Sequence, residues 1–368
     1  MSRVYACSPY RDEKKLQGRE ETEIAWQIIG HVGAVAFLQQ SLATGRVAHA
    51  YLFTGPPQVG KRKLALGVAQ ALNCVGSEPP CGQCPSCLKV VNDTHPDVRV
   101  IEGEGAGGSI KIDQVRALKR EAMLTPYEGR YRVYILRNVD LASLEAANSL
   151  LKILEEPPEH VVLVLTAVQP ESVPATVLSR CQRLDLRPVA HRVLETLLRD
   201  RGIAEPQAQL LVRLSGGRVG WVLDASGDNA LLDHRQRDLD QMIQLFGATR
   251  VERLDFAWEI SRKPDASRAL IELWMVWWRD LLLVHNQGQD HVINIDRSDE
   301  LGWMAGRSTM SQVRSTLDAL QSAAAQLDAN VNARLAWEGL MLNLPHLSIP
   351  PRQQAEQVGA GDMVSAPA

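Results

Sequence analysis

Two short stretches of this 368-residue sequence contain side chains whose types and spacing could do chemistry. In the first, GPPQVGK, Gly55, Gly60 and Lys61 occupy the positions of the phosphate-binding pattern G-x-x-x-x-G-K-[ST]. Such a loop follows a strand and opens a helix, so that backbone N–H groups, the helix dipole and the lysine all face the phosphates. The apolar run at 50–55 and the helical spacing from residue 61 supply both flanks, which favours a phosphate-loop fold over a chance turn.

The loop lacks the groups that would hold a magnesium ion. Arg62 stands where the pattern requires a serine or threonine hydroxyl. The second magnesium contact is an acid at the end of another buried strand, but the run 131–136 continues into Arg137 and Asn138, and Asp140 lies further along the chain. We therefore expect that this chain does not hydrolyse ATP and that its ATP binding is weak or absent.

The second stretch, CVGSEPPCGQCPSC, contains four of the six cysteines at the spacing C-x6-C-x2-C-x2-C. Four thiolates on a tight loop with Gly and Pro suit tetrahedral zinc in a closed structural site. An iron–sulfur cluster is the alternative, but the ferredoxin run requires a further cysteine where this chain has Val91. The expected structural zinc ligands are Cys74, Cys81, Cys84 and Cys87.

The elements around these stretches alternate between strand and helix patterns. Helical spacing is found at 61–74 and at 141–158, where the expected buried set is Leu144, Ala147, Leu151 and Leu154. Apolar runs with little alternation predict buried strands at 50–55, 97–103, 131–136, 161–168 and 183–189. This alternation predicts an α/β domain with a parallel sheet and helices on both faces.

The rest of the chain is predicted to be helical, between a polar leader at 1–23 and a disordered tail at 347–368. One apolar stripe consists of Leu270, Trp274, Trp277, Trp278 and Leu281. By default such a stripe belongs to a hydrophobic core, and the alternative is an oligomer interface anchored by the tryptophans.

The bulk composition limits the function classes. A net charge of −3 argues against a chain coated with basic surface for nucleic acid. No segment approaches the ~20 apolar residues of a membrane helix, and the N-terminus lacks the apolar core of a signal peptide. We interpret the protein as cytoplasmic.

Several motifs together closely resemble a known family. HAYLFTG before the phosphate loop, then LLKILEEPP and SRC, occur in this order with the four cysteines between the first two. Over residues 24–225 the chain resembles bacterial clamp-loader subunits, which are AAA+ proteins of the DNA polymerase III holoenzyme. The resemblance implies a P-loop AAA+ domain at 24–188 with a zinc-binding insert at 74–87, a helical lid at 189–228 and an all-α C-terminal oligomerisation (collar) domain at 229–346.

The departures from the family's motor pattern indicate the type of subunit. The gamma/tau motor has a complete phosphate loop and an acidic pair, whereas this chain has Arg62 and Arg137-Asn138. It is therefore similar to the non-hydrolysing delta-prime type, which is not an enzyme on its own but part of a DNA-directed DNA polymerase (nucleotidyltransferase) holoenzyme. The alternative is a divergent, ATP-hydrolysing gamma/tau-type subunit.

The resemblance also implies roles for single residues. Arg180 in the S-R-C motif would be an arginine finger that acts in trans on a neighbour's ATP site, and the alternative is an ordinary salt bridge. Thr166 matches the first sensor position, and Arg218 matches the second sensor only loosely. Cys181 is expected to be a small buried residue.

The implied partners are the gamma/tau motor subunits and the clamp-opening delta subunit. The sliding clamp and primed DNA would be reached through the assembled complex, with contacts to DNA phosphates, and no membrane is involved. A zinc-dependent nucleic-acid-binding module is the third hypothesis. The acidic balance and the lack of basic and aromatic clustering around the cysteines count against it.

Overall fold

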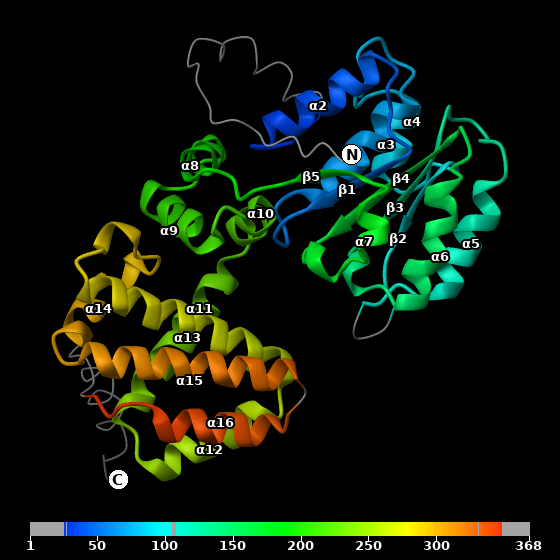
Figure 1. Cartoon of the computed structure of the whole chain (residues 1–368). Coiled ribbons are helices and arrows are strands. Elements are labelled where there is room, and N and C mark those ends of the chain that lie inside the picture. The colour runs from blue at the N-terminus through cyan, green and yellow to red at the C-terminus, as the bar shows by residue number, and fades with distance from the viewer. Residues whose placement is uncertain (1–25, 27, 105–107, 330, 348–368) are drawn as a thin grey trace, which may run out of the picture. The chain divides into compact units, whose positions relative to one another are not determined.

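The computed structural model describes residues 26–347 except 27, 105–107 and 330 (Figure 1). The expected leader and residues 348–368 of the expected tail lie outside this range. The chain divides into two compact units. The first, called the α/β unit, contains the described residues up to Leu197 together with Ser215–Leu223, and the remainder forms the helical unit. The segment 189–228, expected to be a lid, contributes to both.

A five-stranded parallel sheet in the order β2-β3-β4-β1-β5 forms the centre of the α/β unit. Every residue of β1 and β4 is buried, because both faces of the sheet are covered. The predicted fold class is confirmed, with each strand inside or within one residue of its predicted run. The strands are β1 Ala50–Thr54, β2 Val98–Ile101, β3 Arg132–Leu136, β4 Val161–Ala167 and β5 Gln182–Asp185.

Successive strand side chains enter two different cores. Tyr51 and Phe53 of β1 pack with α2 and α3, whereas Ala50 and Leu52 pack with α5 and α6 on the opposite face (Figure 1). The helices of this unit are α2 Val32–Ala43, α3 Lys61–Asn73, α4 Pro85–Val91, α5 Ile112–Ala122, α6 Leu144–Glu155 and α7 Ala175–Leu178, with short 3-10 turns η2 Val139–Leu141 and η3 Pro170–Ser172.

The structure corrects the expected buried face of α6. Leu144 is exposed and Leu151 is only partly buried. The hydroxyl of Ser143 accepts the backbone N–H of Ala146, so the helix begins at Leu144, whose side chain lies outside the core at the first turn. The side chains that face the sheet are Ala146, Ala147, Leu150, Ile153 and Leu154.

Three helices follow the sheet: α8 His191–Asp200, α9 Glu205–Ser215 and α10 Val219–Gly227. Gly216 and Gly217 separate the last two, and both have a left-handed backbone. At Gly217 a side chain would also collide with Pro188, because a Cβ would lie 2.6 Å from the proline Cβ.

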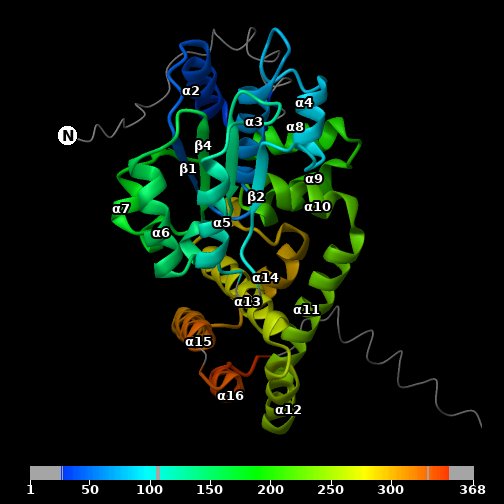
Figure 2. The same ribbon diagram turned by 90° about the vertical axis from the view of Figure 1, so that its right-hand side faces the viewer.

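The helical unit is built around α13, which packs against α15, while α12 packs against α16 (Figure 2). Trp274, Trp277, Trp278 and Trp337 are completely buried, and the first and last of these form an edge-to-face pair with centroids 5.5 Å apart. The elements are α11 Asn229–Gly247, α12 Arg250–Ser261, α13 Pro264–His285, η4 Gln289–His291, η5 Ile295–Arg297, α14 Ser298–Ala305, α15 Met310–Asp328 and α16 Ala333–Asn343. None of the helices in the described ranges combines the length and apolar character needed to cross a bilayer.

Candidate functional site

Helix α3 positions a candidate site at each of its ends. The phosphate loop enters its first turn at Lys61, and Cys74 caps its last turn. Gly55 and Gly60 have φ values of 141° and 116°, a region that side chains rarely adopt. A Cβ on Gly55 would lie 2.2 Å from the carbonyl oxygen of Leu186. The turn therefore requires both glycines for its own geometry.

Lys61 is directed into its own loop. Its Nζ donates to the carbonyl oxygens of Gly55 at 2.6 Å and Pro56 at 2.7 Å, and the residue is only 7% exposed. Burial lowers the pKa of Lys61 to about 8, while the Asp140 carboxylate opposes that shift and the Arg137 guanidinium adds to it. The cation that would meet a phosphate is thus bonded to backbone oxygens of the same loop.

The loop is also held by two other segments of the α/β unit. The His31 ring nitrogen Nε2 lies 2.8 Å from the carbonyl oxygen of Val59, and the backbone N–H of Gly220 donates to the carbonyl oxygen of Gln58 at 2.8 Å. A Cβ on Gly220 would lie 3.0 Å from that same oxygen. The start of α10 therefore lies directly against the loop.

The exits of β3 and β4 are linked by polar contacts. Arg137 forms an ion pair with Glu102. The backbone N–H of Asn138 donates to the Thr166 hydroxyl at 3.1 Å, and the Asp140 carboxylate accepts two backbone N–H groups just after β4. Thr166 and Asp140 therefore each make a contact that fixes the shape of this edge of the sheet.

The four cysteines predicted to bind zinc come together in space. Their sulfur atoms all lie within 4.8 Å of one another, and those of Cys74 and Cys84 are 4.0 Å apart. Ligands at Zn–S bonds of about 2.3 Å would lie roughly 3.8 Å apart at the corners of a tetrahedron, so the set fits zinc. Backbone N–H groups of Gly76, Cys81, Cys84 and Cys87 donate to these sulfurs.

The electrostatics differ across the cluster. Burial raises the pKa values of Cys74 and Cys87. Burial acts in the same direction on Cys84, but N–H groups of Cys87 and Val75 outweigh it and lower its pKa to about 6. Zinc binds thiolates, so the buried thiols would lose their protons to solvent when the metal ion binds.

The base of the insert is tied to the body of the α/β unit. The Asp97 carboxylate accepts backbone N–H groups from Tyr127 at 2.7 Å and from Glu128 and Gly129 at 2.8 Å. Burial favours a higher pKa for Asp97, but these three N–H groups and Arg132 hold it below its ordinary value.

Arg180 lies just after α7, on the surface of the α/β unit. Its guanidinium donates to the carbonyl oxygen of Thr176 at 2.9 Å and pairs with Glu155 at 2.8 Å, and its side chain is 35% exposed. The neighbouring Cys181, expected to be a small buried residue, is partly buried and packs against the core, and desolvation raises the pKa of its thiol to about 12. Arg218 donates from Nε to the carbonyl oxygen of Ser215 at 2.6 Å.

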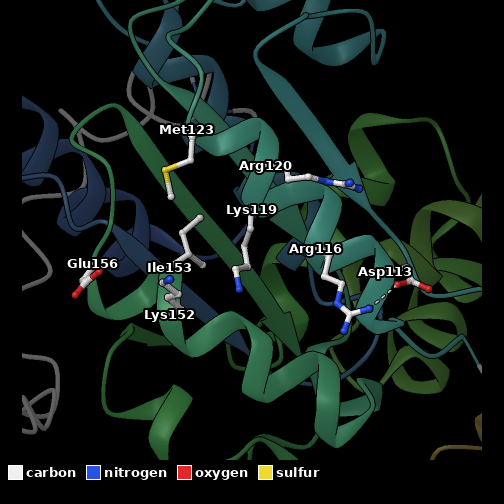
Figure 3. Close-up of a pocket in the computed structure, with 8 residues that line it drawn as sticks. All are labelled: Asp113, Arg116, Lys119, Arg120, Met123, Lys152, Ile153 and Glu156. Atoms are coloured by element: carbon white, nitrogen blue, oxygen red, sulfur yellow. Dashed lines mark hydrogen bonds and ion pairs between the residues drawn. The ribbon is translucent and has the colours of Figure 1, made fainter.

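Sequence reasoning missed a cationic cleft between α5 and α6, with a volume of about 690 Å³ (Figure 3). The carboxylates of Asp113 and Glu156 lie at opposite ends of it, and Arg116 pairs with Asp113 at 3.3 Å. The cleft brings together Arg116, Lys119, Arg120 and Lys152, with Met123 and Ile153 as its apolar members.

A signal for this cleft was present in the sequence. Val115, Leu118 and Ala122 follow helical spacing and form the buried face of α5. The basic residues between them therefore had to lie on the exposed side. Their neighbour Lys152 comes from a different helix, which periodicity alone does not place beside α5.

The chain is similar to known proteins of one kind. Residues 30–190 match the family model described as DNA polymerase III, delta subunit. Over 331 residues the chain is 28% identical to DNA polymerase III subunit delta' of Bacillus subtilis, covering 87% of this chain and 98% of that one. Over 216 residues it is 36% identical to DNA polymerase III subunit tau of Escherichia coli, covering 55% of this chain but only 33% of tau.

Among solved structures, a DNA polymerase III gamma subunit-related protein from Thermotoga maritima matches with a TM-score of 0.46 and 17% identity, over 83% of this chain and 97% of that one. The sequence relatives and the family model confirm the clamp-loader resemblance that the motifs carry.

Proposed function

Because this chain is similar to DNA polymerase III subunits of the clamp loader, we propose that it is the non-hydrolysing, delta-prime-type member of a bacterial clamp loader. In this role it scaffolds a complex with gamma/tau and delta subunits that loads the sliding clamp onto primed DNA. It also supplies Arg180 in trans to the ATP site of a neighbouring subunit. The match to delta' along nearly its whole length supports this subunit type over the motor type.

The observation that carries the proposal is the state of the phosphate loop. Lys61 donates to two carbonyl oxygens of its own loop, and it would have to give up both bonds to meet a phosphate. Arg62 brings no hydroxyl for magnesium, and the strand that should end in an acid ends beside Arg137. The loop thus acts as a structural turn, and hydrolysis takes place on other subunits.

The surroundings of Arg180 suit a residue that acts on a neighbour. Its ion pair with Glu155 joins two partly exposed side chains, and such pairs contribute only ~0–1 kcal/mol. Exchange of this carboxylate for the phosphates of a bound nucleotide therefore costs little. A guanidinium is suited to that contact, because its planar fork bonds two phosphate oxygens at once.

The cationic cleft supports a contact with DNA. Arg116, Lys119, Arg120 and Lys152 provide four cations against two carboxylates, and backbone phosphates are the part of DNA that such groups bind without regard to sequence. In the assembled loader we assign this cleft to phosphates of the primed duplex.

The test is ATP turnover, stimulated by clamp and primed DNA, in a loader reconstituted from this chain with gamma/tau and delta subunits. We expect the chain alone to show no turnover. Arg180→Ala should lower turnover of the complex about two- to tenfold, because fingers give ~10³–10⁵ at one site but other sites keep working. The matched control is Arg183→Ala, which removes an exposed arginine paired with Asp185 and should change nothing.

Assembly of each variant is checked by size-exclusion chromatography, so that loss of turnover is separated from loss of the complex. DNA stimulation should also weaken as salt is raised, because phosphate contacts release counterions. Turnover by the chain alone, free of contaminating ATPase, would instead favour a divergent motor subunit. An Arg180→Ala complex with full turnover would exclude the finger role.

A further inference from the structure

Arg180 has a charged partner on another structural element, the carboxylate of Glu155 at the end of α6. Nη2 of Arg180 lies 2.8 Å from Oε1 of Glu155. Nη1 donates to the carbonyl oxygen of Thr176 at 2.9 Å and to the Ser179 hydroxyl at 3.3 Å, both from the turn that precedes Arg180. Within the described residues, Glu155 is the only carboxylate paired with this guanidinium. The orientation of the guanidinium toward α6 therefore depends on Glu155.

The backbones on both sides of this pair are fixed by the core of the α/β unit. Helices α6 and α7 lie side by side (Figures 1 and 2). Leu154, which precedes Glu155, and Val177 of α7 are buried in the same hydrophobic cluster. The backbone N–H of Arg180 donates to the carbonyl oxygen of Val177 at 3.1 Å. A break of the ion pair would therefore free the guanidinium without moving either helix.

The position of Glu155 does not serve the helix that contains it. Glu155 is the last residue of α6, and the next residue, Glu156, is also acidic. The C-terminal end of a helix favours cations, so a carboxylate there is unfavourable for the helix. Lys152 is the residue of this turn whose charge suits the helix dipole. The contact that compensates the Glu155 carboxylate is the ion pair with Arg180.

This ion pair occupies a nitrogen atom that a phosphate would need. A guanidinium binds a phosphate best when two of its N–H groups bond two oxygens in parallel. In Arg180 both terminal nitrogens are engaged, Nη2 by Glu155 and Nη1 by the carbonyl oxygen of Thr176. The carbonyl oxygen carries no net charge, whereas the carboxylate neutralises the guanidinium. Glu155 is therefore the stronger competitor of the two.

We propose that Glu155 is a positioning residue, which holds Arg180 in a resting orientation and yields it to a phosphate group of the nucleotide on the neighbouring subunit. The inference rests on the function proposed above and specifies how the finger is restrained. While the pair persists, Arg180 is withheld from the neighbouring site. The apparent affinity for a ligand falls with the fraction of protein that is ready to bind it. The pair should therefore raise the ATP concentration that the loader needs.

The experiment removes the charge of Glu155 and keeps the shape of its side chain. In the reconstituted loader with saturating clamp and primed DNA, Glu155→Gln should lower the ATP concentration for half-maximal turnover about two- to fivefold, because partly exposed pairs are weak. Maximal turnover should not change. The melting temperature of the chain should stay the same or rise, because a charge unfavourable to α6 is lost. The matched control is Glu159→Gln, which removes the same charge from an exposed residue just beyond α6 and should change neither kinetic value.

A double variant separates this role from a merely structural one. If Glu155 acts through Arg180, then Glu155→Gln should have no further effect on the half-maximal ATP concentration when Arg180→Ala is already present. An equal decrease in both backgrounds would overturn the inference, because Glu155 would then act on a group other than the finger.

An unchanged or higher half-maximal ATP concentration for Glu155→Gln would overturn the proposed restraint, as would an equal decrease for Glu159→Gln. Lower maximal turnover of Glu155→Gln would also overturn it, since the pair would then belong to the active arrangement. Full turnover of Arg180→Ala would exclude the finger role in the proposed function, and this inference with it. Reduced turnover of Arg180→Ala beside unaltered kinetics of Glu155→Gln would leave the proposed function standing without the restraint.

Discussion

A group of side chains that could bind a charged ligand lies at each end of α3, and the two groups differ in whether the chain itself supplies their bonding partners. At the N-terminal end, Lys61 is satisfied by carbonyl oxygens of its own loop. At the C-terminal end, four sulfurs converge to within 4.8 Å of one another and accept backbone N–H groups. The first arrangement is complete within the chain, whereas the second would be completed by a cation.

This difference shows that a match to a sequence motif does not by itself indicate a functioning binding site. The glycines and lysine of the phosphate loop are explained by the turn they build, so their presence says little about a nucleotide. The N–H contacts of the four sulfurs do not require all four thiols to converge on one point, whereas a shared metal ion would. The comparison therefore predicts that removal of a metal ion from the cysteines unfolds the insert. Removal of the Lys61 side chain should change the stability of the chain little.

The largest expected effect is the loss of zinc from the cysteine end. Purified chain should contain about one zinc ion, and its removal by a chelator, or the change Cys84→Ser, should unfold the insert, since structural zinc contributes ~10–16 kcal/mol in zinc-finger peptides. Metal analysis, together with limited proteolysis between residues 74 and 97, measures this. Cys181→Ser is the control, because Cys181 lies outside the cluster and should keep both the metal and the insert. Iron in place of zinc, or an insert that stays folded without metal, would contradict the prediction of a structural zinc ion.

An intermediate effect is expected at Asp97, which accepts three N–H groups at the base of the insert. Asp97→Asn turns an NH2 group toward at least one of these donors. It should lower the free energy of unfolding by about 1–3 kcal/mol at pH 7, measured by urea unfolding. The exposed Asp113→Asn is the matched control and should cost almost nothing.

The loss of unfolding free energy caused by Asp97→Asn should depend on pH. In the folded chain its pKa lies below the ordinary value, so its contribution is fully present above the unfolded pKa of about 3.9. That contribution is lost as the pH falls through the lower folded value. The difference between the wild type and Asp97→Asn should therefore shrink in acid. A difference that grows in acid would contradict this assignment.

The smallest effect is expected at Lys61. Lys61→Met should change unfolding by less than about 1 kcal/mol at pH 7, because lost bonds to carbonyls are offset by not burying a charge. Loader turnover should not change at all, whereas a nucleotide-binding lysine could not be removed silently. The exposed Lys63→Met on the same helix is the control. A loader disabled by Lys61→Met would show that this loop binds nucleotide.

Lys61 gives a pH dependence of the same sign, but in the alkaline range. Its folded pKa is about 8, below the value of 10.5 for a free lysine. Between these two values the unfolded chain holds a proton that the folded chain has released, so the stability of the wild type should rise with pH relative to Lys61→Met. A relative fall over this range would mean that the charged lysine is favoured in the folded chain.

Local patterns were sufficient for the five strands and for the two ends of α3. All five strands lie within one residue of the predicted runs, and the two that are buried throughout, β1 and β4, are continuous apolar segments that a sheet covered on both faces can bury. The buried face of α6 was misjudged at Leu144, since a helix start depends on the cap at Ser143 rather than on apolar spacing. Helix α5 and its cleft were missed.

The sequence by itself determined the five strands, the convergence of the cysteines and the absence of a magnesium-binding hydroxyl at Arg62, because each depends on residues that are close along the chain. Only the tertiary structure decided that Lys61 bonds to its own loop, that Lys152 joins α5 in a cationic cleft, and that Trp258 rather than the tryptophans of α13 is exposed. These outcomes depend on which distant segments cover a side chain. Helical and strand periodicities give the direction of a side chain but not the identity of its neighbour.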